Sequence, residues 1–321
     1  MAGLPVPGIL VNEIFKDTEL FSRAVGWDLD FRQIDHGSLR AKALMFGHAE
    51  IAVLRVEFNR SFHQIGAPPE GFLTFGFPDK ESGVLRWSGI ETPPGVLINF
   101  NYKKRLDCVS PAPFGGFVLS FNKDVLRSAS ENQGYDRQLI ESLDARRFWE
   151  PNENNGDQLR QDLKALEKVA TDDGDQGLGL WREVFNTDLA TLIVRILSGQ
   201  SSSPPLVAPQ FRSAAMNRAI EILGDFNQFP INIEALCTMV GASWATLQRA
   251  FSEEFGVTPS SYIKSRRLAA VQTELIKNGP KTVISDVANR WGFWHMGSFA
   301  SDYRKQFGEL PSATLSRLKS Q

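Results

Sequence analysis

The chain has 321 residues, of which 42% are hydrophobic and 22% charged, and a formal net charge of −2. This length exceeds the usual size of one hydrophobic core and predicts two domains. No apolar run reaches the roughly 18 residues of a membrane span, and the N-terminal stretch lacks the charged and apolar regions of a signal peptide. We therefore expect no membrane partner, a cytoplasmic location, and reduced thiols at Cys108 and Cys237.

The charge is unevenly distributed along the chain. Residues 1–210 carry 22 Lys+Arg against 28 Asp+Glu, a net of −6, whereas residues 211–321 carry 13 against 9, a net of +4. A basic C-terminal part suits a polyanionic partner at that end only. The counts are modest, and the alternative is chance scatter.

Residues 25 to about 121 are predicted to form strands. The stretch 51–59 alternates, with Arg55 and Asn59 on one face and Val56 on the other. Four further short apolar runs are separated by turns that contain Pro and Gly; these runs are Phe72–Phe77, Val84–Trp87, Gly95–Phe100 and Gly116–Phe121. Regular strands at this spacing favour a β-barrel or sandwich.

After Asn122 the apolar residues follow helical spacing. One stripe runs from Leu159 to Val169, and a denser one covers the helix expected at 178–198. The second helix either packs on its own domain, which we favour, or against a second copy of the chain. The stretch rich in Ser and Pro at 200–210 is the expected linker.

A helix-turn-helix is predicted around the sequence GASWATLQRAFSEEFGVTPSSY, which begins at Gly241. A short apolar helix precedes the glycine, which can take a positive φ and end that helix. Ser243 can cap the next helix with its hydroxyl oxygen. In that helix Leu247 and Phe251 share the buried stripe, and Arg249 lies on the opposite face.

The same pattern occurs again about fifty residues later. Gly292 repeats Gly241 at an offset of 51, and Tyr303 repeats Phe251 at an offset of 52, so the second turn is one residue longer. A Gly-x-x-Pro terminator follows both helices. A plain helical bundle would not be expected to repeat these features in order, so the repeat predicts two DNA-binding units.

These motifs resemble the DNA-binding domain of the AraC/XylS family of bacterial regulators. Its first pattern, LxRxFxxxxGxxPxxY, is present from Leu247 to Tyr262, and its second, GFxxxxxFxxxFxxxFGxxP, from Gly292 to Pro311 with tyrosine at the second internal aromatic position. The resemblance implies two helix-turn-helices joined by a long helix, here at about 260–278. It also implies a cupin-like sensing half, although the N-terminal likeness rests on the order of elements alone.

We therefore expect an α+β protein with three parts. These are a sensing and dimerisation domain at 1–199 (a cupin-like β-barrel or sandwich to about 121, then a helical connector), a linker at 200–210, and an all-α tandem helix-turn-helix domain at 211–321. Dimerisation would use either the 178–198 helix or the β-rich part. The partners expected are double-stranded DNA, a small effector, a second copy of the chain and RNA polymerase.

The DNA-binding residues follow from the chemistry of the groove, which needs cations for phosphates and donors for base edges. The resemblance places Gln248 and Arg249 at base-facing positions, whereas the corresponding positions of the second unit hold Ala300 and Ser301. The two half-sites should therefore be read unequally. The predicted DNA-binding set is Ser243, Trp244, Ala245, Gln248, Arg249, His295, Met296, Gly297, Ser298, Ser301, Arg304 and Lys305. Further phosphate candidates are Arg218, Lys264, Arg266, Arg267 and Lys281.

The effector site is expected at Arg55, Asn59 and Arg60 of the β-rich part. Guanidinium groups bind phosphate, carboxylate or guanine through paired N–H donors. A cyclic dinucleotide such as cyclic di-GMP is one chemically sensible effector. The alternative, which we favour, is a solvated strand face, because arginine is mostly an exposed residue.

A metal-dependent cupin-type enzyme is the competing class. The four histidines, His36, His48, His63 and His295, show no HxH spacing, and no nucleophile, phosphate or dinucleotide motif is present. We therefore expect no catalytic residue, no metal and no cofactor. The predicted function is a ligand-responsive, sequence-specific DNA-binding transcription regulator, which acts as either an activator or a repressor. The main alternative is a DNA-binding regulator whose N-terminal domain only dimerises.

Overall fold

A computed structural model describes residues 8–92, 95–102, 106–136, 138–180, 187–199, 214–224, 233–279 and 282–318. The chain divides into two compact units. The first comprises residues 1–30, 40–59 and 64–209, and the second comprises 31–39, 60–63 and 210–321. The predicted linker, 200–210, lies outside the described residues.

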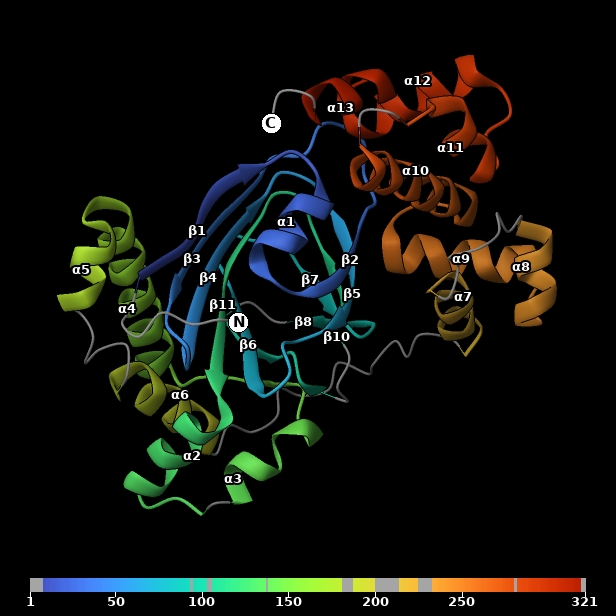
Figure 1. Ribbon diagram of the computed structural model, residues 1–321. Helices are drawn as coiled ribbons and strands as arrows, with labels where there is room; N and C mark the ends of the chain where they lie inside the picture. The colour runs from blue at the N-terminus through green and yellow to red at the C-terminus, as the bar shows by residue number, and fades with distance from the viewer. Residues whose placement is uncertain are drawn as a thin grey trace. The chain divides into compact units, whose positions relative to one another are not determined.

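Antiparallel strands form two sheets (Figure 1). The strands are β1 Gly8–Phe15, β2 Asp28–Gln33, β3 Ala41–Gly47, β4 Ile51–Phe58, β5 Phe62–Ala67, β6 Phe72–Pro78, β7 Leu85–Trp87, β8 Ile90–Thr92, β9 Leu97–Asn99, β10 Leu106–Ser110, β11 Phe114–Asn122 and β12 Phe148–Trp149. The seven-stranded sheet has the order β1-β3-β4-β11-β6-β9-β12, and the five-stranded sheet β2-β5-β10-β7-β8. The predicted apolar runs correspond to β6, β7, β9 and β11.

The chain is mainly helical after Asn122, as the change to helical spacing predicted, and one further helix lies between β1 and β2. In the first part of the chain they are α1 Thr18–Val25, α2 Lys123–Asn132, α3 Gln138–Glu141, the 3-10 turn Leu143–Ala145, α4 Glu153–Asp172, α5 Gly174–Leu180 and α6 Leu189–Ser198. The stripe on α4 is buried through Leu159, Leu163 and Leu166. It packs with α6 against the seven-stranded sheet in one apolar core (Figure 1).

Helix α6 is almost wholly buried in that core. Leu189, Ala190, Leu192, Ile193, Val194, Ile196 and Leu197 are each at most 5% exposed. Packing on its own domain, the interpretation favoured from the sequence, is therefore confirmed for α6. Its apolar side chains are not available to a second copy of the chain.

The described residues of the C-terminal part form helices and no strand, which confirms the predicted α+β class. Its helices are α7 Ala214–Gly224, α8 Ile233–Val240, α9 Trp244–Phe255, α10 Pro259–Asn278, α11 Ile284–Arg290, α12 Met296–Phe307 and α13 Pro311–Leu318. The predicted long helix is α10, and Gly279 ends it with φ +73°. Leu268, Val271 and Leu275 of α10 share a core with Phe299 and Tyr303 of α12.

Candidate DNA-binding surface

The first helix-turn-helix consists of α8, a glycine turn and α9. Gly241 has φ +70°, the left-handed conformation that favours glycine, and its N–H donates to the Cys237 carbonyl oxygen at 2.9 Å. Ser243 caps α9, because its hydroxyl oxygen accepts from the Thr246 N–H at 3.2 Å. Leu247 and Phe251 are fully buried. The turn, the cap and the buried stripe predicted from the sequence are all confirmed.

The second helix-turn-helix repeats this construction with α11 and α12. Gly292 has φ +80°, and its N–H donates to the Asn289 carbonyl oxygen at 3.0 Å. Phe299 and Tyr303 are buried as their counterparts in α9 are. Helix α12 begins at Met296 in spite of Gly297, which stands in its first turn with open space beside it.

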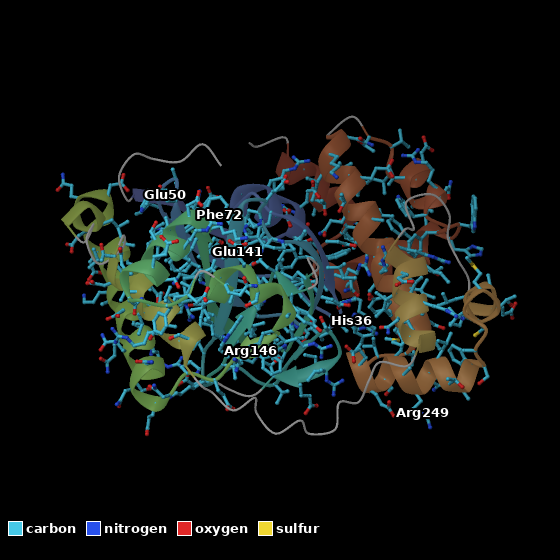
Figure 2. All side chains as sticks on the ribbon, turned by 90° about the horizontal axis from the view of Figure 1, so that it is seen from below. His36, Glu50, Phe72, Glu141, Arg146 and Arg249 are labelled. Atoms are coloured by element: carbon cyan, nitrogen blue, oxygen red, sulfur yellow. The ribbon has the colours of Figure 1, made fainter. Side chains whose placement is uncertain are left out.

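Most of the predicted DNA-binding side chains are exposed. The Arg249 side chain is 77% exposed and projects from α9 (Figure 2). Met296 is an exception, because it packs against the core below α12. The other predicted residues that are exposed are Ser243, Trp244, Ala245, Gln248, His295, Gly297, Ser298, Ser301, Arg304 and Lys305. The two second helices thus present the predicted surfaces outward.

Comparison with known proteins identifies the family. Residues 236–317 match the family model described as a helix-turn-helix domain. The chain is 33% identical over 137 residues to the XylDLEGF operon transcriptional activator 2 of Pseudomonas putida, a match that covers 42% of this chain and 84% of that protein. The chain belongs to the AraC/XylS family.

Two further similarities extend beyond the helix-turn-helix units. The XylDLEGF operon transcriptional activator 3 of Pseudomonas putida is 27% identical over 238 residues, and the match covers 70% of this chain and 66% of that protein. The solved structure of the AraC-like transcriptional activator CuxR matches 80% of this chain and 94% of its own at 16% identity, with a TM-score of 0.43. The similar proteins are transcription regulators and not enzymes, which confirms the expectation of a regulator over a cupin-type enzyme.

The phosphate candidates of this AraC/XylS protein differ in availability. Arg218, Arg304 and Lys305 are exposed. Lys264 pairs with Asp302 at 3.2 Å, and burial lowers the pKa of Arg267. Lys281 lies outside the described residues. Arg304 and Lys305 are therefore the cations of α12 best placed for phosphates.

A polar network that the sequence did not suggest lies within the second unit. Gln33 and Gln306 exchange hydrogen bonds, each side-chain amide donating to the other's backbone carbonyl oxygen at 2.9 and 3.1 Å. The Arg32 guanidinium donates to the Tyr262 hydroxyl at 2.9 Å, and His63 Nδ1 lies 2.5 Å from the same oxygen. Gln306 sits between buried Tyr303 and Phe307 on α12, and that polar residue among apolar ones was the signal available in the sequence.

The predicted effector residues already have partners in the structure. Arg55 lies 2.7 Å from Asp79, 3.3 Å from Glu57 and 3.7 Å from Glu167 of α4, and its side chain is only 12% exposed. Gly115 leaves room for the pair of Arg55 and Asp79, because a Cβ atom at position 115 would lie 2.4 Å from the Asp79 carboxylate. The interpretation that we favoured for Arg55, a solvated strand face, is therefore wrong, because α4 covers that face of β4.

Asn59 and Arg60 have partners as well. Asn59 Oδ1 accepts from the Arg40 N–H at 2.7 Å, and Arg60 donates to the His36 carbonyl oxygen at 2.6 Å and lies 3.3 Å from Asp35. An anionic effector would have to displace carboxylates from both arginines. The assignment of Arg55, Asn59 and Arg60 to an effector stays a prediction, and these ion pairs count against it.

Neither a cluster of metal ligands nor a membrane-spanning helix occurs in the described ranges. They contain no group of three or more His, Cys, Asp or Glu side chains that could hold a metal ion. Within the same part of the chain, no helix is both long enough and apolar enough to span a bilayer.

Proposed function

We propose that this AraC/XylS family member is a sequence-specific DNA-binding transcription activator whose N-terminal domain binds a small effector. The main support for the proposal is the pair of helix-turn-helix units. Each unit has a glycine turn with positive φ and a second helix with an exposed face. In such units the second helix enters the major groove. The two helices would read successive major grooves, about 34 Å apart, from a single chain.

The exposed side chains of the two units suit different contacts with DNA. Helix α9 offers Gln248 and Arg249, whose donors are long enough to reach base edges. Helix α12 offers the short Gly297 and Ser301, followed by the cations Arg304 and Lys305. We expect the first unit to supply most hydrogen-bonded base reading and the second to bind mainly through phosphates.

The effector is proposed on the family likeness, and its chemistry stays open. The ion pairs at Arg55 and Arg60 weaken the argument for an anion such as cyclic di-GMP. A homodimer and a contact with RNA polymerase complete the proposal. Since α6 is buried in its own domain, we expect the β-rich part to form the dimer interface.

Binding-site selection on randomised duplex DNA with the full chain tests the DNA-binding proposal. An enriched site with two half-sites one helical turn apart supports it, and the absence of any enriched site would overturn it. A thermal-shift screen of metabolites, nucleotides and cyclic di-GMP tests the effector, since a ligand that binds only the native state raises the melting temperature. If no compound shifts the melt, the N-terminal domain is better explained as a dimerisation module.

A further inference from the structure

An exposed tryptophan stands beside the second recognition helix. Trp294 is 71% exposed, the highest value among the exposed large apolar side chains of the described residues. It follows the glycine turn of the second helix-turn-helix and lies two residues before α12 begins. A single exposed apolar side chain is common on protein surfaces, so the exposure of Trp294 alone does not indicate a binding site.

The backbone on both sides of Trp294 is fixed by hydrogen bonds. The Phe293 N–H donates to the Ala288 carbonyl oxygen at 3.0 Å, and the His295 carbonyl oxygen accepts from the Phe299 N–H at 2.9 Å. The Phe293 ring packs inward, 5.2 Å from the Phe299 ring. Trp294 therefore projects from a rigid turn, which lowers the entropy lost when its side chain makes a contact.

The first unit also has an exposed indole near the start of its second helix. Trp244 is 43% exposed and is the first residue of α9, three positions after Gly241, while Trp294 comes two positions after Gly292. Each recognition helix thus begins beside an exposed tryptophan. The two tryptophans are not at equivalent positions of the repeat, but both lie within two residues of the start of a recognition helix.

The neighbouring residues indicate which partner would cover Trp294. The N-terminal end of a recognition helix is the part that approaches base edges. Gly297 and Ser298 are small and exposed, so they leave the backbone of α12 free to come close to the groove. Arg304 and Lys305 further along the helix attract phosphates. These features match DNA better than an apolar protein surface.

We propose that Trp294 reads thymine in the second half-site, through contact between its indole ring and the C5-methyl group in the major groove. The methyl group is the apolar feature that distinguishes thymine there. This inference rests on the proposed function, because it requires α12 to enter the groove. It gives the second unit a base preference that its short polar side chains do not supply.

The test uses the full chain and its selected DNA site, with each thymine of the second half-site replaced in turn by deoxyuridine. This change removes one methyl group and keeps base pairing. In the wild type, replacing the one or two thymines that contact Trp294 should weaken binding about fourfold per replacement. This factor corresponds to about 0.8 kcal/mol for the loss of one buried methyl group. Trp294→Ala should bind the thymine site about tenfold more weakly and lose its sensitivity to those replacements. Trp294→Phe should keep part of both.

Leu310→Ala is the matched control, because Leu310 is 42% exposed and follows the C-terminal end of α12. It should bind like the wild type, and unchanged circular dichroism melting should confirm that each variant is folded. If Trp294→Ala binds DNA as tightly as the wild type, or keeps the full deoxyuridine penalty, the inference is wrong. A variant that binds DNA normally but fails to activate transcription would point to a protein partner and also overturn it. Failure of the wild type to select any DNA would instead refute the proposed function.

Discussion

Arg249→Ala tests which residue reads bases in the first half-site. The Arg249 guanidinium is highly exposed on α9 (Figure 2), and it lies 3.9 Å from the Glu253 carboxylate, one helical turn away. An exposed pair of this kind stabilises a helix by about 0.3–0.5 kcal/mol. Alanine is the best helix former, so the variant should fold normally.

The expected loss follows from the hydrogen bonds that the guanidinium can make. A bidentate contact to guanine discriminates against other bases by about 1–3 kcal/mol. Releasing Glu253 would offset at most about 0.5 kcal/mol of this. We therefore expect Arg249→Ala to lose about 0.5–2.5 kcal/mol on the preferred site, or about 2- to 70-fold in affinity.

Fluorescence anisotropy on the selected site and on its single-base substitutions measures the effect. The variant should bind the preferred duplex more weakly and the duplex substituted at the contacted base with unchanged affinity, so the preference at that base pair disappears. Arg249→Lys keeps the charge without the fork of donors and should restore affinity more than preference. An equal loss on every sequence would show that Arg249 contacts phosphate, and no loss would remove it from the interface.

Four further predictions concern other parts of the chain. Arg304→Ala should weaken binding to all sequences alike and reduce the slope of log affinity against log salt by about 1, measured by anisotropy at several salt concentrations; a sequence-dependent loss would contradict this. Phe251→Ala removes a fully buried ring and should destabilise the helical part by about 3–5 kcal/mol in urea. Arg55→Ala leaves Asp79 without its 2.7 Å partner and should cost about 1–3 kcal/mol, whereas a change below about 0.5 kcal/mol would mean that the pair is solvated. Hydrogen bonds from Lys123 and Arg127 lower the pKa of Glu141 to about 2. The ionised carboxylate therefore stabilises the fold above pH 4.5, and this stabilisation is lost as the pH falls toward 2. In Glu141→Gln the melting temperature should depend less on pH between pH 4.5 and 2 than in the wild type.

Local sequence determined the DNA-binding units. Gly241 and Gly292 adopt positive φ, Ser243 caps α9, and the stripes on α9 and α12 are buried as their spacing predicts. Each of these features depends on residues within about one helical turn, so a short stretch of sequence contains the needed information. The repeat of the pattern then indicated the family.

The β-rich part could be predicted only in outline. Strands β6, β7, β9 and β11 coincide with apolar runs bounded by turn residues. Strand β3, with the nearly continuous apolar sequence AKALMFG, is buried at six of its seven positions and lacks the alternation that marks a half-exposed strand. Strand β1 lies before the region where strands were expected.

Tertiary structure alone decided how the exposed and charged residues are used. Arg55 looked like one residue of an open strand face, but Glu167 lies more than a hundred positions along the chain and brings α4 over that face. Gln306 bonds to Gln33 across a still longer separation. Trp294 is exposed because Phe293 takes the inward position in the turn, packed against Phe299. Spacing along a chain predicts which residues share a face, but what covers that face depends on elements that meet only when the chain folds.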